Sequence, residues 1–198
     1  LFSYFVNLTC FIIALFTAIF AVLYDSHMKR VKLIGNFYVA YTMAIPFVFG
    51  AAAVIEGNTL SLNIHPAIFI IAIIAFLAGS GREIMKDVQD YEGDKEKGVK
   101  SFPRYIGKRK SNILASLFFI TAIALSFFPF FMNQYTIYYL NVAYFLPVLV
   151  CDNILLTAAL QLLFKKEPNL KIYRKFTLLA IFIGLIAFLT GALIKIGF

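Results

Sequence analysis

The sequence predicts an all-α membrane protein, a multi-span helical bundle that forms a single domain, with about six to seven helices present. Three observations lead to this prediction. The 198 residues are 62% hydrophobic and only 14% charged, and their mean hydropathy of +0.86 lies outside the range of ordinary soluble domains. The charged residues are clustered, so long uncharged runs separate them. Nearly all the basic residues fall in alternate connections between those runs, as in multi-span proteins.

Six apolar runs approach or exceed the length of a helix that crosses the hydrocarbon core, which needs about 17 to 25 residues. They cover residues 8–24, 36–55, 65–81, 112–132, 136–164 and 176–194. Residues 1–6 are predicted to be the end of a preceding helix. We expect Asn36 to be the N-cap of the second span, and His65 to be an interfacial cap before Pro66 in the first turn of the third.

The basic residues orient the bundle. All 18 Lys and Arg residues except Lys195 lie in three connections, at about residues 25–35, 82–111 and 165–175. The positive-inside rule places these three loops in the cytoplasm and predicts a multi-pass protein of the cell membrane. The net charge of +8 is therefore explained by topology and by contact with anionic membrane lipids, and it does not indicate nucleic-acid binding.

The stretch from Gly81 to Pro103 follows the third span and carries a run of acids. If the helix continues, four carboxylates project within about 60° of one another on one face, at 100° per residue. These are Glu83, Asp87, Asp90 and Asp94. Mg²⁺ takes one or two carboxylates together with phosphate oxygens. The spacing of three and four residues therefore predicts a Mg²⁺ site formed by Asp87, Asp90 and Asp94.

A narrower basic stripe lies beside the acids. Arg82 and Lys86 are one helical turn apart, and their side chains can hold an anion next to the cations. The combination predicts half of a Mg²⁺-diphosphate site at a membrane surface. A second ionisable group, Asp152, lies inside the fifth span, where it is either a functional residue or the partner in a hydrogen bond between helices.

The stretch Gly-Arg-Glu-Ile-Met-Lys-Asp-Val-Gln-Asp-Tyr-Glu-Gly-Asp, which opens at Gly81, resembles the second aspartate-rich motif of the UbiA-type intramembrane prenyltransferases. The earlier segment from Tyr24 to Asn36 is similar to the family's Tyr-Ser-x-x-x-Lys segment, with Asp25 where Ser is common. The resemblance implies a bundle of nine helices around a central cavity. Two aspartate-rich motifs at its cytoplasmic side would hold Mg²⁺ and a prenyl diphosphate.

The resemblance also implies roles for individual residues. The metal-binding and catalytic residues would be Asp87, Asp90 and Asp94. The diphosphate-binding residues would be Lys29, Arg82, Lys86 and Tyr24, and further candidates are Asn36, Lys100 and Asp152.

The reaction implied is transfer of a prenyl group, geranylgeranyl, from its diphosphate to a lipid-precursor acceptor. The wording of the motif is closest to family members of ether-lipid synthesis, whose acceptor is geranylgeranylglyceryl phosphate. An aromatic acceptor of quinone biosynthesis is the alternative. The family's first motif, Asn-Asp-x-x-Asp, does not occur in these 198 residues. We therefore expect the chain to be the C-terminal two-thirds of a longer protein and to be inactive alone.

Two other classes of protein were considered. A CDP-alcohol phosphotransferase is disfavoured, because its acids are followed by Asp-Gly and Ala-Arg, whereas Tyr91 follows Asp90 here. A transporter or channel with a charged cytoplasmic loop predicts acids that face water.

Overall fold

The computed structural model describes residues 2–26, 31–55, 64–133 and 137–195. In these ranges the elements are all helices, and six helical segments are long and apolar enough to cross a membrane. The predicted all-α, multi-span class is confirmed. The long helices are α2 (Leu8–Ser26), α3 (Lys32–Ala53), α4 (Pro66–Gln89), α6 (Phe102–Ser126, extended by α7, Phe128–Phe131), α8 (Val142–Phe164) and α9 (Leu170–Leu193). The short ones are α1 (Phe2–Val6) and α5 (Tyr91–Glu96).

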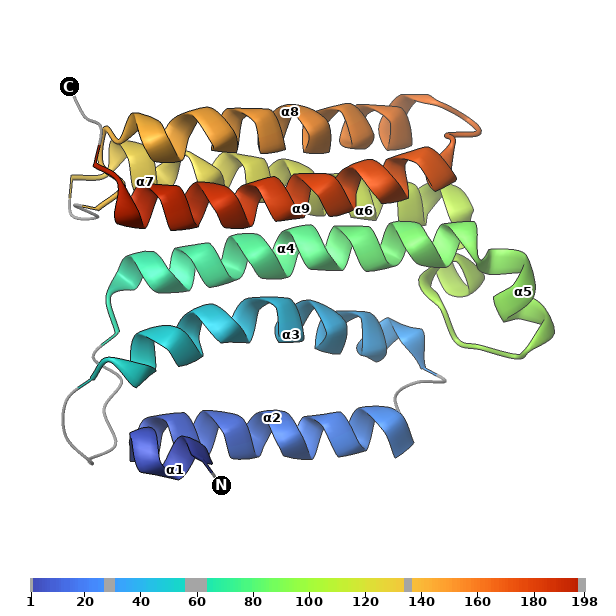
Figure 1. The fold of residues 1–198 in the computed structure, drawn as a ribbon. Coiled ribbons are helices and arrows are strands. Elements are labelled where there is room, and N and C mark those ends of the chain that lie inside the picture. The colour runs from blue at the N-terminus through green and yellow to red at the C-terminus, as the bar shows by residue number, and fades with distance from the viewer. Residues whose placement is uncertain (1, 27–30, 56–63, 134–136, 196–198) are drawn as a thin grey trace.

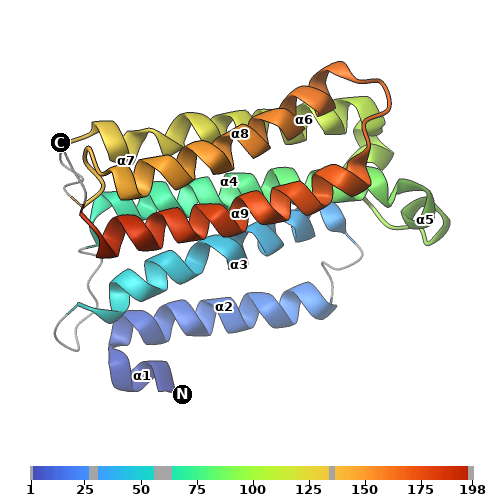
Figure 2. The same cartoon turned by 45° about the horizontal axis from the view of Figure 1, so that its top comes forward.

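The long helices lie side by side, with α4 in the middle of the bundle (Figure 1). Helix α4 contacts α3 on one side and α6 and α9 on the other. The short helix α5 projects from one end of the bundle in both views (Figures 1 and 2). We call this the α5 end. The start of α3, the end of α4 and the start of α6 all lie there.

Glycines allow α4 to approach both of its neighbours closely. A Cβ on Gly79 would lie 2.8 Å from the sulfur of Met43 in α3, and a Cβ on Gly81 would lie 2.9 Å from the carbonyl oxygen of Ala115 in α6. Small residues at such contacts are typical of helices packed within a membrane. Helix α4 is the most buried of the six spans, and the burial extends into its last turn at Asp87 and Val88.

The start of the second span differs from the prediction. Helix α3 begins at Lys32, one turn before Asn36, so the expectation that Asn36 is an N-cap is wrong. The reason is a contact distant in sequence: Val31 forms an isolated backbone bridge with Lys100, and the Leu33 amide donates to the Lys100 carbonyl at 3.3 Å. The third span starts as expected, because the His65 side chain accepts a hydrogen bond from the Ala67 amide.

The acidic stretch is not one continuous helix. Helix α4 ends at Gln89, Asp90 caps it with φ −89° and ψ 6°, and α5 begins at Tyr91. The expectation of a single helical face that runs through Asp94 is therefore wrong. Asp94 instead belongs to α5. Its position relative to Asp87 therefore depends on how α5 packs against the other helices at the α5 end.

Candidate functional site

Asp87 is at the centre of the candidate site. It lies in the last turn of α4 and is only 1% exposed. The Asn36 side-chain amide donates to Asp87 Oδ2 at 2.7 Å, and the Lys32 ammonium lies 3.4 Å from Asp87 Oδ1. Lys32 and Asn36 are one turn apart on α3, so the same face of α3 presents both side chains to α4. A buried carboxylate is costly unless it is paired in this way.

The second carboxylate of the site, Asp94, comes from α5. The Lys32 ammonium donates to Asp94 Oδ2 at 2.7 Å. One cationic group therefore contacts carboxylates from two helices, and it brings Asp87 and Asp94 within reach of a shared cation. The spacing of the acids predicted that these two would lie together, but Lys32 was not among the predicted site residues. The available signal was its spacing of four residues from Asn36, on the same helical face.

Asp90 is not part of this pair. Its carboxylate is partly exposed at the break between α4 and α5, and it makes no ion pair or side-chain hydrogen bond with any residue that the structure describes. Over the described ranges, no group of three His, Cys, Asp or Glu residues is arranged to hold a metal. Of the three predicted metal-binding carboxylates, the structure thus brings together two, Asp87 and Asp94, with Asp90 nearby in sequence.

The basic stripe on α4 has its own counter-ion. Glu83, expected to belong to the acidic face, instead pairs with both neighbours: Arg82 Nη1 and Lys86 Nζ each lie 3.0 Å from one of its carboxylate oxygens. Glu83 does not provide an acceptor for every hydrogen-bond donor of this stripe. Arg82 Nε is buried and has no hydrogen-bond partner among the described residues, so Arg82 retains a donor for an anion.

Other predicted residues lie at varying positions relative to this site. Lys100 is beside it, since its backbone is paired with Val31 and Leu33 at the start of α3. The Tyr24 ring stacks on Tyr38, with 4.8 Å between ring centroids. Tyr38 is about 200° around α3 from Asn36, so the structure does not bring Tyr24 together with Asp87. Lys29 lies outside the described residues.

Helix α5 is also held from the side of α6. Lys108 Nζ donates to Glu92 Oε1 at 2.7 Å and lies 4.6 Å from the centre of the Tyr91 ring. The hydrogen bond from Lys108 lowers the pKa of the exposed Glu92 carboxyl. This contact is on the solvent side of α5, so it fixes α5 only weakly.

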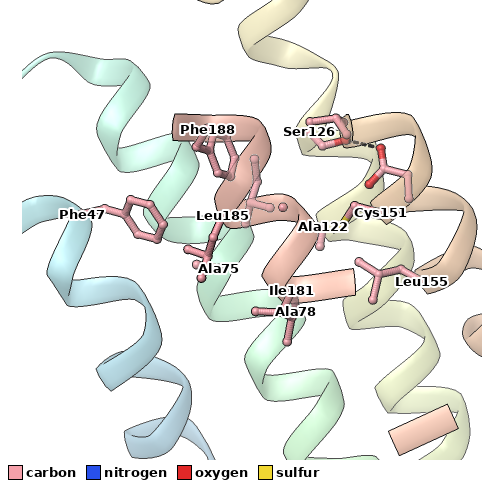
Figure 3. Close-up of a pocket in the computed structure, with 14 residues that line it drawn as sticks. Phe47, Ala75, Ala78, Ala122, Ser126, Cys151, Leu155, Ile181, Leu185 and Phe188 are labelled. Carbon is pink, nitrogen blue, oxygen red and sulfur yellow. Dashed lines mark hydrogen bonds between the residues drawn. The ribbon is translucent and has the colours of Figure 1, made fainter. Parts of the chain in front are cut away.

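An apolar groove of about 930 Å³ runs between α3, α4 and α9. Apart from Thr42 and Lys175, its lining side chains are apolar, and the exposed Lys175 lies in the second turn of α9, toward the α5 end. The groove shares four lining residues with a smaller inner cavity of about 60 Å³, which Figure 3 shows. The shared residues are Phe47, Ala75, Ile181 and Leu185.

Asp152 lines the inner cavity, where Ser126 of α6 donates a hydrogen bond of 2.7 Å to its Oδ2 (Figure 3). It lies 12 residues before the end of α8 at Phe164, which places it about 18 Å from the α5 end at 1.5 Å per residue. The structure therefore does not bring Asp152 together with Asp87. Its contact with Ser126 is the interhelical hydrogen bond that the sequence left as one of two alternatives.

Comparisons with known proteins agree with this architecture. The sequence model of the UbiA prenyltransferase family matches residues 1–181. Digeranylgeranylglyceryl phosphate synthase of Archaeoglobus fulgidus is 39% identical over 170 residues, which is 85% of this chain and 55% of that protein. The enzymes of the same name from Methanosarcina mazei and Pyrococcus furiosus are each 34% identical, over 96% and 98% of this chain and 62% and 64% of their own lengths.

A solved structure from work on digeranylgeranylglyceryl phosphate synthase in membranes has a similar fold. It matches with a TM-score of 0.80 and 33% sequence identity, over 97% of this chain and 64% of that one. The chain thus spans between 55% and 64% of the length of these relatives.

Proposed function

The chain belongs to the UbiA prenyltransferase family, and from this premise we propose that it takes part in Mg²⁺-dependent transfer of a geranylgeranyl group from its diphosphate to geranylgeranylglyceryl phosphate, in ether-lipid synthesis. The acceptor follows from the three relatives above, which carry the name digeranylgeranylglyceryl phosphate synthase. Because the chain covers less than two thirds of their length, this activity is proposed for the full-length protein.

The main support for the proposal is that two carboxylates contact the same ammonium group, that of Lys32. Lys32 contacts Asp87 and Asp94 at once, so a cation at this position can be bound by both. A transporter with a charged loop predicts acids that face water, whereas Asp87 is buried and Asp94 is only 9% exposed. The burial of both carboxylates therefore favours a binding site over a solvated loop.

The residues present fit Mg²⁺. Carboxylate oxygens are the ligands that this hard cation prefers, and it usually takes one or two of them and completes its shell with water and phosphate oxygens. Asp87 and Asp94 would hold the ion, Asp90 would bind it directly or through water, and Asn36 would keep Asp87 oriented. Bound Mg²⁺ neutralises the charge that builds on the diphosphate as it leaves.

The anion half of the proposed site is formed by Arg82 and Lys86, which lie on a different face of α4 from Asp87. Arg82 and Lys86 project from the same side of α4, about 140° and 100° around the helix from Asp87. In the proposed complex they donate to phosphate oxygens, the buried Nε of Arg82 providing a donor that has no partner in the described chain. Lys29 stays a predicted diphosphate contact. Lys100 is held nearby by its backbone pairing with α3.

The apolar groove suits the prenyl chain. Ala75 lines both the groove and the inner cavity and lies 12 residues before Asp87 on α4, about 18 Å along the axis. A geranylgeranyl main chain with bonds of about 1.5 Å extends roughly 20 Å. A prenyl chain whose diphosphate is bound at Asp87 would therefore be long enough to reach the groove at Ala75, where apolar side chains exclude water.

In this arrangement the chain's own residues position and shield the reacting atoms. The C–O bond to the diphosphate breaks with its electron pair on the leaving group, which Arg82 and Lys86 help to stabilise. The allylic cation that remains is captured by the glycerol hydroxyl of the acceptor, which then loses its proton. The groove keeps competing water away from the cation.

The test uses the full-length protein in detergent or nanodiscs, with labelled geranylgeranyl diphosphate, Mg²⁺ and either acceptor. We expect labelled product with geranylgeranylglyceryl phosphate and none after chelation of the metal. Product with an aromatic acceptor alone would replace the proposed acceptor by the quinone-type alternative. The absence of product with either acceptor would contradict the proposed activity.

A further inference from the structure

The Lys32 ammonium lies between the two carboxylates assigned above to the metal. Its ammonium lies 2.7 Å from Asp94 Oδ2 and 3.4 Å from Asp87 Oδ1. In the part of the chain that the structure describes, the Asp94 carboxylate has no other ion pair. A divalent cation bound to the same two carboxylates would sit about 2.0–2.1 Å from their oxygens, so the ammonium and the cation cannot occupy the pair together.

The Lys32 side chain is able to leave this position. Its side chain is 25% exposed, and a lysine ammonium is a compact charge on a flexible four-carbon stem. It can therefore move into solvent without unfolding α3. Asp87 would keep its hydrogen bond from Asn36 during this exchange, so the carboxylate stays oriented while its cation changes.

Lys32 also contributes to the position of α5. The segment after α5 is tied to α3 through the backbone at Lys100, and the outer side of α5 is tied to α6 through the exposed Lys108–Glu92 pair. The inner side of α5 is tied to α3 through the contact between Lys32 and Asp94. That contact therefore helps to hold the second carboxylate of the pair close to the first.

We propose that Lys32 is an internal competitor for the divalent cation: it holds the Asp87–Asp94 pair together in the metal-free protein and is displaced when the metal binds. The inference rests on the proposed function only in assigning these two carboxylates to the metal. It makes Lys32 a positioning residue whose removal should strengthen metal binding and whose ammonium should become more accessible when the metal binds. A cation that stayed in place would weaken metal binding through its charge but would not gain accessibility.

The test measures the Kd for Mn²⁺ of the full-length protein in detergent by electron paramagnetic resonance. No prenyl diphosphate is present. Lys32→Met should lower the Kd for Mn²⁺ by roughly five- to tenfold, because the metal no longer displaces an ion-paired ammonium. Lys32→Arg retains a cation and should bind Mn²⁺ within about twofold of wild type. The matched control is Lys95→Met, which removes an exposed charge one residue from Asp94; it should also change the Kd by no more than about twofold.

A second measurement needs no variant. In wild-type protein, Mn²⁺ should increase the rate at which an amine-acylating reagent modifies Lys32, read by mass spectrometry, while the rate at Lys95 stays constant. An unchanged rate at Lys32 at saturating Mn²⁺, or a Kd that rises or does not change in folded Lys32→Met, would overturn the inference. Failure of prenyl transfer with the Lys32 results intact would remove the proposed function and leave this inference standing.

Discussion

Substitution of Asn36 tests whether its side chain orients the Asp87 carboxylate for metal binding. Its side-chain amide donates to Asp87 Oδ2 at 2.7 Å, and both residues are buried, at 4% and 1% exposure. A hydrogen bond to a charged group contributes about 1.5–3 kcal/mol. Since about 1.4 kcal/mol is tenfold, Asn36→Ala should weaken Mn²⁺ binding or lower kcat/KM by roughly ten- to a hundredfold. Loss of an outer partner of a metal ligand typically has an effect of this size.

The assay compares full-length wild type, Asn36→Ala and a matched control, Asn153→Ala. Asn153 is exposed in α8, and among the described residues its side chain donates only to the Leu149 carbonyl of its own helix. We expect the control to keep wild-type Mn²⁺ affinity and prenyl transfer. If folded Asn36→Ala keeps both within about twofold of wild type, the claim that Asn36 orients Asp87 for the metal is refuted.

Two further predictions concern the bundle. Arg109 donates to the carbonyls of Leu162, Leu163 and Lys165 at the end of α8, so Arg109→Ala should cost about 0.5–1.5 kcal/mol of stability by removing these hydrogen bonds. Thermal unfolding in detergent should show a lower Tm for Arg109→Ala and an unchanged Tm for exposed Lys110→Ala, and equal values for both would contradict the capping role. Asp152→Asn should keep prenyl transfer, because an amide oxygen still accepts from Ser126. Loss of transfer in this folded variant would show that Asp152 acts as more than a hydrogen-bond partner.

Hydropathy predicted the spans well but their ends poorly. The six apolar runs correspond to six long helices, because a helix that crosses a membrane must be apolar over most of its length. Helices α3 and α6 begin before their runs, at Lys32 and Phe102, because hydropathy reports contact with lipid and not the helical backbone. Within α6, Gly107 takes a non-helical conformation with φ 82°, which allows its charged first turns to bend away from the apolar part.

The part of the candidate site that lies on one helix was predictable from the spacing of its residues. The pattern from Arg82 to Asp87 belongs to α4 as expected, and the structure brings Asn36 to Asp87. The break at Asp90 was not predictable from periodicity, since the acids have helical spacing on both sides of it. The link from Lys32 to Asp94 joins residues 62 apart in sequence, and such a contact depends on the tertiary fold rather than on local pattern.

The most direct test of the central claim is Asp87→Asn in the full-length protein, assayed for Mg²⁺-dependent geranylgeranyl transfer to geranylgeranylglyceryl phosphate. The substitution keeps the size of the side chain and removes its charge, and Glu167→Gln makes the equivalent change at an exposed carboxylate between α8 and α9. Asp87→Asn should abolish transfer, whereas Glu167→Gln should keep the wild-type rate. Normal turnover by folded Asp87→Asn would contradict a metal-binding role for this carboxylate, and with it the proposed site.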